Sequence, residues 1–237
     1  MTTAMIERVK ELQVKVVDDQ VEAAHDIQDL LATRGIRTTV ITPLPQHSIE
    51  DLLHLLASPH PTAALVDHRL SERSGIHFTG ARLAALLNRQ GTPAVLFSSR
   101  TERHSYEVKV ELIDIPAYLD RSDIHDADRI AVALDAARSE TVDKVPMERR
   151  KTYPTLVRVV NVVPNPLGVM VRILVPAWHR DDDVIIPLSW LERQPPTDVR
   201  SLINQRYMAM VNICTEDARE IFVDQARRIS PSREASP

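Results

Sequence analysis

The chain has 237 residues, a formal net charge of −4 and a hydrophobic content of 43%, enough for one large domain or two small ones. It contains no apolar run as long as a membrane span and no signal-peptide core at its N-terminus. Its single cysteine, Cys214, excludes disulfide frameworks and cysteine-based zinc sites, and we expect a cytoplasmic protein without membrane partners.

In the first half of the chain, short apolar runs alternate with segments of helical periodicity. The strand candidates are residues 14–17, 38–41, 63–66, 94–97 and 115–119. The helix candidates are residues 21–31, 49–56, 80–89, 102–112 and 126–138. Strands that alternate with helices in this way indicate a parallel sheet with both faces covered. We therefore expect an α/β fold over residues 13–138, a flavodoxin-like doubly wound (βα)5 domain.

In the second half of the chain the pattern changes to strands. Residues 139–153 are charged and lack an apolar stripe, so we interpret them as a linker. Strand-like runs follow at residues 156–163, 169–175, 183–188, 207–213 and 219–225. They predict a small, mainly antiparallel β domain over residues 154–228, with one or two short helices between residues 187 and 204. Residues 229–237 are expected to be a disordered tail.

Charge is divided unevenly between the halves. Residues 1–140 have a net charge of −6 and residues 141–237 a net charge of +2. The basic residues of the second half are dispersed, whereas nucleic-acid binding requires a concentrated basic patch. The sequence therefore gives no support to a nucleic-acid partner.

Three aspartates follow predicted strands of the first half. Asp18 and Asp19 come directly after the first strand, and Asp67 comes directly after the third. In a flavodoxin-like sheet the carboxyl ends of these strands are neighbours and open on the ligand crevice. Three converging carboxylates repel each other unless a hard cation lies among them, and Mg²⁺ prefers such ligands. Taken alone, the Asp18–Asp19 pair is more typical of a strand that ends in a solvated turn, and it is the combination with Asp67 that favours a pocket.

The segments VKVVDDQ, ALVDHRL, PAVLFSS and AYLDR resemble, in order and spacing, the receiver domain of bacterial two-component response regulators. The resemblance covers residues 13–138. It implies that Asp67 is the phosphoacceptor and attacks the phosphorus of a phosphohistidine donor. It also implies a Mg²⁺ ion held by Asp18, Asp19, Asp67 and the backbone carbonyl of Arg69.

The resemblance extends to the residues that switch such domains. Ser98 has the position of the hydroxyl residue that moves toward the new phosphoryl group, and Tyr118 that of the aromatic residue that follows it. Where the family has a lysine that contacts the phosphoryl group, this sequence has Arg121, and Ser122 replaces the usual proline. Arginine keeps the charge, but its planar fork is no substitute for a compact ammonium group. If Gly80 aligns with the family's loop glycine, about five residues are inserted within residues 71–79.

Several of these residues also have a purely structural explanation. Arg121 is as well explained by a surface position as by a place in the pocket. Tyr118 needs no role beyond that of an aromatic residue in the core. The nine histidines show no zinc-binding spacing, and the acidic run at residues 181–183 is expected to be a solvated loop. Cys214 is expected to lie in a strand, buried and inert.

The function that this resemblance implies is that of a response-regulator-like signalling protein, a phosphoprotein in a two-component phosphorelay. Its partners would be a histidine kinase or phosphotransfer protein, an unidentified protein that binds the β domain, and in some cases a second copy in a homodimer. We expect no enzymatic activity beyond its own phosphorylation and dephosphorylation. Two alternatives remain open: a phosphorylation-independent pseudo-receiver scaffold, and a β-type DNA-binding transcription factor, since a β-ribbon can enter the major groove.

Overall fold

The structure is a computed structural model that describes residues 3–57, 62–70, 75–99 and 101–229. The chain divides into two compact units, Met1–Met147 and Glu148–Pro237, and the division falls within the segment expected to be a linker. Apart from Ile229, the expected disordered tail lies outside the described residues. No helix among the described residues combines the length and the apolar character that crossing a bilayer requires.

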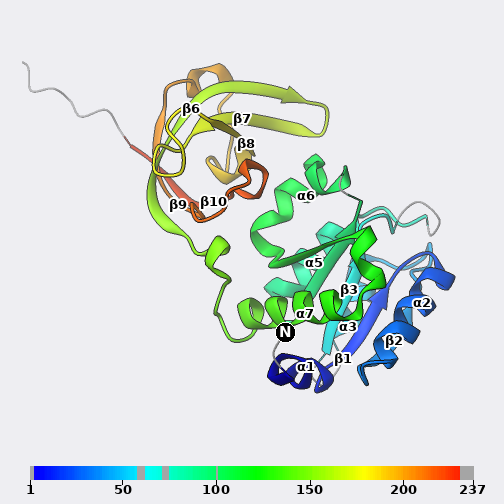
Figure 1. Cartoon of the computed structure of the whole chain (residues 1–237). Coiled ribbons are helices and arrows are strands. Elements are labelled where there is room, and N and C mark those ends of the chain that lie inside the picture. The colour runs from blue at the N-terminus through cyan, green and yellow to red at the C-terminus, as the bar shows by residue number, and fades with distance from the viewer. Residues whose placement is uncertain (1–2, 58–61, 71–74, 100, 230–237) are drawn as a thin grey trace, which may run out of the picture. The chain divides into compact units, whose positions relative to one another are not determined.

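The first unit is built on a parallel five-stranded sheet (Figure 1). Its strands are β1 (Gln13–Val17), β2 (Arg37–Ile41), β3 (Thr62–Asp67), β4 (Ala94–Ser98) and β5 (Ala117–Asp120). Their order is β2-β1-β3-β4-β5, which is the flavodoxin-like doubly wound order. The predicted fold class of this half is therefore confirmed.

Helices cover both faces of this sheet, and a separate apolar core lies on each side. The helices are α1 (Thr3–Lys10), α2 (Val21–Ala32), α3 (Ile49–Leu56), α5 (Gly80–Arg89), α6 (Tyr106–Glu111) and α7 (Ala127–Thr141). One core joins α1, α2 and α7 to the sheet, and the other joins α3, α5 and α6. Because successive residues of a strand point to opposite faces, the fully buried strands β3 and β4 supply side chains to both cores.

Two elements differ from the sequence prediction. Helix α1 precedes the predicted start of the domain, and its Val9 is part of a core. The single helix predicted at residues 102–112 is divided into the 3₁₀ turn η1 (Glu102–His104), α6 and the 3₁₀ turn η2 (Leu112–Asp114). The division has a local cause: Ser105 is extended, and its hydroxyl accepts a hydrogen bond of 3.3 Å from the backbone N–H of Val108. Ser105 thus caps a new helix where a continuous one was expected.

Inside the first unit, a lysine supports the end of a helix. Lys15 of β1 is buried, and its ammonium group donates to the backbone carbonyls of Leu55 and Leu56, at 2.7 and 3.4 Å. These carbonyls belong to the C-terminal end of α3, where a helix leaves acceptors unsatisfied and favours positive charge. Burial lowers the pKa of Lys15, and the two carbonyls provide the hydrogen-bond acceptors that solvent would otherwise supply.

The second unit is an antiparallel five-stranded sheet, as the sequence predicts for this half. Its strands are β6 (Tyr153–Asn165), β7 (Gly168–Leu174), β8 (Asp183–Pro187), β9 (Arg206–Val211) and β10 (Val223–Arg228), in the order β10-β9-β6-β7-β8. The inward-facing residues of these strands form a third core. Strand β6 pairs first with β9 and then with β7, and a bulge between Val159 and Asn161 marks the exchange of partners.

The connections of the second unit hold short 3₁₀ turns. They are η5 (Leu188–Trp190), η6 (Val199–Leu202) and η7 (Ala218–Glu220). The last strand begins at Val223 instead of residue 219, because Asp217 accepts a hydrogen bond from the N–H of Arg219 and caps η7. Cys214 was predicted to be buried in a strand, and this is wrong: β9 ends at Val211, and Cys214 is exposed in the loop that follows.

A close approach between β3 and α5 fixes the end of β3. The N–H of Gly80, the first residue of α5, donates to the carbonyl of His68 over 2.9 Å. A Cβ atom on Gly80 would lie 1.7 Å from the carbonyl oxygen of Asp67, closer than any van der Waals contact allows. Only glycine fits at this position, and its presence keeps Asp67 against the first turn of the helix.

Replacing Gly80 with Ala is expected to destabilise the protein by about 1–3 kcal/mol, because the added methyl group forces β3 and α5 apart. Helix propensity alone predicts the opposite sign, since Ala is favoured over Gly by about 1 kcal/mol within a helix. Urea unfolding followed by far-UV circular dichroism measures the difference.

The control variant is Gly91→Ala. Gly91 has φ of +88° and open space where the added methyl group would lie, so only the backbone strain of about 1–2 kcal/mol applies. A Gly80→Ala protein as stable as the wild type would show that β3 and α5 do not approach this closely.

Candidate functional site

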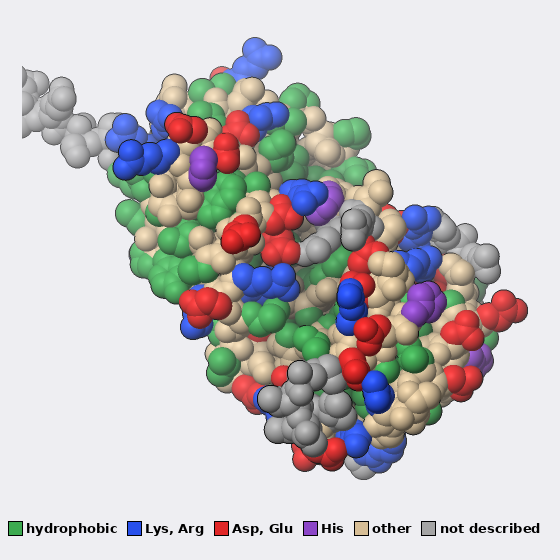
Figure 2. All heavy atoms as spheres, viewed as in Figure 1, with side chains coloured by type: hydrophobic (Ala, Val, Ile, Leu, Met, Phe, Trp, Pro, Cys, Tyr) green, Lys and Arg blue, Asp and Glu red, His purple; other side chains and the backbone are tan. Residues whose placement is uncertain are grey.

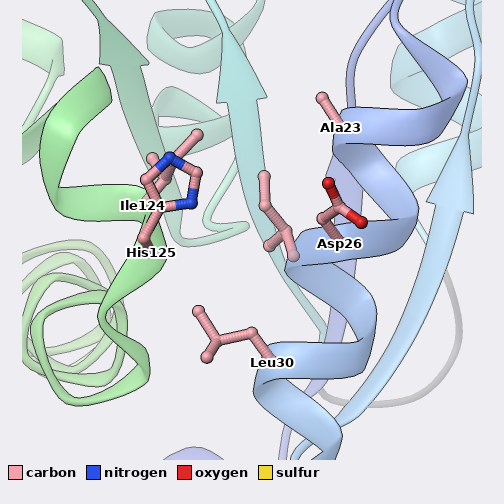
Figure 3. A pocket seen from close by; sticks show the side chains of 6 residues that line it. Ala23, Asp26, Leu30, Ile124 and His125 are labelled. Atoms are coloured by element: carbon pink, nitrogen blue, oxygen red, sulfur yellow. The ribbon is translucent and has the colours of Figure 1, made fainter.

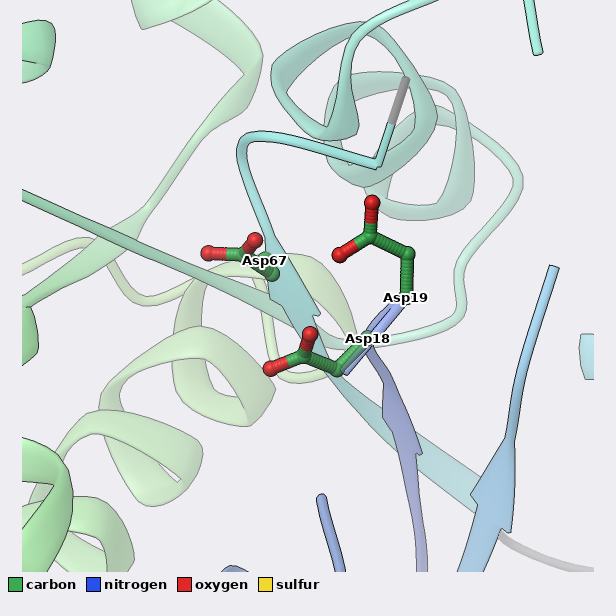
Figure 4. A group of neighbouring side chains, drawn as sticks. All are labelled: Asp18, Asp19 and Asp67. Atoms are coloured by element: carbon green, nitrogen blue, oxygen red, sulfur yellow. The ribbon is translucent and has the colours of Figure 1, made fainter. Parts of the chain in front are cut away.

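Three aspartates converge at the carboxyl edge of the parallel sheet (Figure 4). Asp18 and Asp19 directly follow β1, and Asp67 is the last residue of β3. Strands β1 and β3 are neighbours with Val17 opposite Val66, so the residues after each strand meet at one edge. One carboxylate oxygen from each residue lies within 4.8 Å of the others, and all three side chains are buried.

Local hydrogen bonds hold two of these carboxylates in place. Asp18 Oδ1 accepts from the N–H of Gln20 over 2.8 Å, just before α2 begins. Asp67 Oδ2 accepts from the N–H of Arg69 over 3.2 Å. Both contacts are the two-residue turns that aspartate commonly forms. The turn and the pocket are therefore not alternatives for Asp18, because its carboxylate caps a turn while it is buried in the cluster.

Arg121 contacts the cluster directly. It begins the 3₁₀ turn η3 (Arg121–His125) after β5, and a guanidinium nitrogen donates to Asp67 Oδ1 over 2.9 Å. The Arg121 side chain is 37% exposed, whereas that of Asp67 is only 1% exposed. The sequence left a surface position and a pocket position open for Arg121. The contact with Asp67 joins Arg121 to the cluster, while its side chain stays partly exposed.

The electrostatics of the site centre on Asp67. Burial and the neighbouring charge of Asp18 raise the pKa of Asp67 from 3.8 to about 6, although Arg121 and the Arg69 N–H act in the opposite direction. Three ionised carboxylates and one guanidinium leave a formal charge of −2. A divalent hard cation would balance that charge, and carboxylate oxygens are the ligands that Mg²⁺ prefers. The donor set therefore fits a magnesium ion.

Ser98 and Tyr118 are joined by a hydrogen bond next to this edge. Asp67 is opposite Phe97, so Ser98 is one residue further along the neighbouring strand β4. The hydroxyl groups of Ser98 and Tyr118 form a short hydrogen bond, and the Tyr118 hydroxyl also donates to the carbonyl of Ser99 over 3.1 Å. Tyr118 is half-buried and packs against the core on the α5 side. It is therefore both a core residue and a polar partner of the strand end beside Asp67.

The structure adds an ion pair that the sequence interpretation missed. Arg69, in the loop after β3, pairs with Glu102 of η1. Glu102 also accepts a hydrogen bond from the N–H of Ser99 over 2.9 Å, and Ser99 Oγ accepts from the N–H of Glu102 over 3.5 Å. These reciprocal bonds are those of a capping box, whose S-x-x-E pattern is present at residues 99–102 and could have been recognised. The pair connects the loops that follow β3 and β4.

A hollow of the first unit lies away from the aspartate cluster (Figure 3). It has a volume of about 170 Å³ between α2 and η3. Its wall is mostly apolar, and Asp26 and His125 are its only titratable lining residues among those described. It shares no residue with the aspartate cluster and offers no comparable chemistry.

No family model and no curated protein is similar enough to this chain to count as a match. Solved receiver domains are similar to the first half. One is the receiver domain of the Francisella response regulator 1452, with 21% identity and a TM-score of 0.40 over 55% of this chain and 98% of that one. Another is the receiver domain of NtrX from Brucella abortus, with 19% identity and a TM-score of 0.41 over 53% of this chain and 98% of that one.

A third similar structure is the receiver domain of a modulated diguanylate cyclase from Desulfovibrio desulfuricans G20. It has 20% identity and a TM-score of 0.44, and covers 56% of this chain and 97% of that one. The likeness to receiver domains is one of fold, and it covers the first half alone; the remainder is the separate antiparallel sheet. The strand order of the first unit establishes its fold independently of these weak similarities.

Replacing Asp67 with Asn is expected to stabilise the metal-free protein at pH 7.5. Because the pKa of Asp67 is about 6 when folded and 3.8 otherwise, its contribution to stability is complete below pH 4 and is lost as the pH rises through 6. The neutral amide avoids that loss, which is on the order of 1–3 kcal/mol after the lost ion pair with Arg121 is considered. Thermal unfolding in EDTA at pH 5 and 7.5 measures the effect.

The gain of the Asn variant should shrink at pH 5, where wild-type Asp67 is largely protonated in the folded state. Millimolar Mg²⁺ provides the matched control, because it should stabilise the wild type at pH 7.5 more than the variant. A variant that is less stable than the wild type at pH 7.5 in EDTA would contradict this account of the site.

Proposed function

We propose that this chain is a response-regulator-like signalling protein that accepts a phosphoryl group on Asp67 and signals through protein contacts of its β unit. The observation that carries the proposal is the convergence of three buried carboxylates with Arg121 at the carboxyl edge of a flavodoxin-like sheet. A nucleophilic carboxylate, a cation site and a fixed positive charge are the parts that phosphoryl transfer requires. The described residues hold no second cluster of this kind.

In the proposed reaction, a carboxylate oxygen of Asp67 attacks the phosphorus of a phosphohistidine. The new O–P bond forms an acyl phosphate. The P–N bond breaks, and its electron pair stays on the imidazole nitrogen. This nitrogen takes a proton from water if the other ring nitrogen carries none. Asp18, Asp19, Asp67 and the carbonyl of Arg69 would hold the Mg²⁺ ion, whose charge offsets that of the phosphoryl oxygens. Arg121 would donate to the same oxygens from the other side.

The raised pKa of Asp67 is compatible with this role. With a pKa of about 6, Asp67 is still mainly ionised at neutral pH, and its negative charge is poorly solvated because the side chain is buried. A desolvated carboxylate is a better nucleophile than one surrounded by water. Bound Mg²⁺ would keep it ionised at lower pH as well.

The proposed signal would pass from Asp67 through Ser98 and Tyr118. The Ser98 hydroxyl is bonded to that of Tyr118, so a Ser98 that turned toward a phosphoryl group would break this bond. Two alternative packings of Tyr118 would then be populated differently in the two states. The expected donors are a histidine kinase or a phosphotransfer protein, and the reader of the signal is a protein bound by the β unit.

A second candidate function rests on the Arg121–Asp67 contact. The guanidinium donates to one oxygen of the carboxylate that would attack phosphorus and contributes positive charge where a cation would bind. In a pseudo-receiver, this ion pair replaces the metal and the phosphoryl group, and the unit is a permanent binding scaffold. The two candidates differ in whether the wild-type cluster takes up a divalent cation.

Incubation of the full chain with phosphoramidate and Mg²⁺ should add one phosphoryl group that is labile to hydroxylamine. Asp67→Asn should abolish this modification, because the amide cannot form the acyl phosphate. Intact-mass spectrometry and Phos-tag electrophoresis measure it. Asp181→Asn, which removes an exposed carboxylate of the other unit, is the matched control and should be modified like the wild type. An unmodified wild type, under conditions that label an ordinary receiver domain, would refute phosphoryl acceptance.

Removing the guanidinium separates the two candidates further. Arg121→Ala should bind Mn²⁺, used as a paramagnetic probe of the magnesium site, about tenfold more tightly than the wild type, because one positive charge near the carboxylates is lost. Electron paramagnetic resonance titration of free Mn²⁺ gives both affinities. If the wild type binds no Mn²⁺ and Arg121→Ala does, the pseudo-receiver is the better description. Unchanged affinity would mean that Arg121 does not act on the cation site.

A further inference from the structure

The outer face of the second sheet carries exposed arginines beside apolar side chains. We call it the arginine face, and its residues are Leu156, Arg158, Arg206, Met208 and Arg227. They belong to the adjacent strands β6, β9 and β10 (Figure 1). The residues between them, such as Val157 and Tyr207, point to the opposite side and are fully buried in the core. The arginine face is thus the side of the sheet that the unit's own core does not cover.

The strand register brings like charges together on this face. Arg158 lies directly opposite Arg206, while Met208 is opposite Leu156 on one side and Arg227 on the other. Like charges opposite each other in an antiparallel pair destabilise a sheet. Leu156 is 39% exposed and Met208 46% exposed, so apolar surface is left in water between the arginines. The fold therefore tolerates two contributions that lower its stability at this face: repulsion between Arg158 and Arg206, and apolar surface of Leu156 and Met208 that is exposed to water.

The same sheet shows how such a cost is avoided. Arg172 of β7 lies on the same side of the sheet, and its guanidinium donates to both carboxylate oxygens of Asp183 on β8 over 3.1 Å. In the described part of the chain, no carboxylate pairs in this way with Arg158, Arg206 or Arg227. Asp224 lies on the same side, opposite Met210, and its carboxylate accepts from the neighbouring Gln225. The arginine face thus presents three guanidinium groups with which no carboxylate of the described residues pairs, although planar carboxylates are their usual partners.

We propose that the arginine face binds an acidic segment of a partner protein in which apolar side chains stand between Asp or Glu residues. The inference rests on the proposed function, because it specifies the partner surface of the β unit. Carboxylates of the partner pair with the three arginines, and its apolar side chains pack on Leu156 and Met208. Arginine and methionine are both typical of protein interfaces, methionine because it adapts to different partners.

The composition of the face favours a protein over a nucleic acid. Its residues include no aromatic ring on which a base could stack, and stacking provides much of single-strand binding. Apolar side chains occupy the centre of the face, where a phosphate backbone would need further positive charge. A peptide with alternating acidic and apolar residues matches both parts of the surface.

To test this, peptides that bind the immobilised full chain are selected from a phage-displayed library of random 16-residue peptides. Peptides enriched in Asp and Glu between Leu, Met or Phe are expected, and a synthetic copy should bind at least tenfold more weakly to Arg158→Glu/Arg206→Glu. Arg193→Glu, exposed in the loop after η5, is the matched charge-reversal control and should bind like the wild type. Selected peptides without acidic residues, or with equal affinity for the double variant, would overturn the proposal.

A stability measurement shows that lost binding is not lost folding. Arg158→Glu alone replaces a repulsive cross-strand pair by an attractive one, so the melting temperature should rise by about 1–5 °C while peptide binding falls. A duplex DNA oligonucleotide and phosphatidylcholine–phosphatidylglycerol vesicles are assayed in parallel. If binding of the DNA or of the vesicles requires Arg158 and Arg206, and no acidic peptide binds in this way, the proposed class of partner is wrong.

Peptide binding is also measured with Asp67→Asn. Binding that persists in this variant, and in a wild type that accepts no phosphoryl group, supports the arginine face even if phosphoryl acceptance fails. Conversely, a protein that is phosphorylated on Asp67 but selects no acidic peptide refutes the arginine face alone.

Discussion

Mutual repulsion among three buried carboxylates is the constraint on which the first unit depends. Asp18, Asp19 and Asp67 are held within 4.8 Å of one another by strands that are themselves fixed by two apolar cores. Ionised groups at this distance, shielded from water, cost free energy that packing must offset. The rest of the site reduces that cost: backbone N–H groups bond to Asp18 and Asp67, and the guanidinium of Arg121 supplies a positive charge.

Close packing around Asp67 holds the carboxylates together against this repulsion. The first residue of α5 must be glycine for the helix to begin against the end of β3, and the ion pair between Arg69 and Glu102 connects the loops on either side. A looser edge would let the carboxylates separate and become solvated, which would relieve the repulsion and disperse the proposed cation ligands.

Much of this arrangement is encoded in local patterns of the sequence. The five apolar runs of the first half predict the parallel strands, and the rule that carboxyl ends of neighbouring strands share an edge brings Asp18, Asp19 and Asp67 together from the sequence alone. The likeness to receiver domains adds Ser98 and Tyr118, which the structure joins by a hydrogen bond.

Other features depend on contacts between distant residues or on a single side chain, and periodicity does not reveal them. In the sequence Lys15 is an ordinary polar residue of a strand, but its ammonium group donates to a carbonyl at the end of a helix forty residues away. The helix break at Ser105 depends on one hydroxyl group, and the pairing of Arg69 with Glu102 on two loops whose geometry no pattern specifies. The apolar residues before Cys214 predict a strand at that position, although β9 ends three residues earlier.

The bulge in β6 has a consequence for the size of anything that binds the second unit. Bulged strands bend, so the flat part of the outer surface ends near Val159, where β6 exchanges β9 for β7. Residues 154–158 extend over roughly 13 Å at the usual rise per residue. A segment of this length matches four or five residues of an extended partner chain that lies along β6.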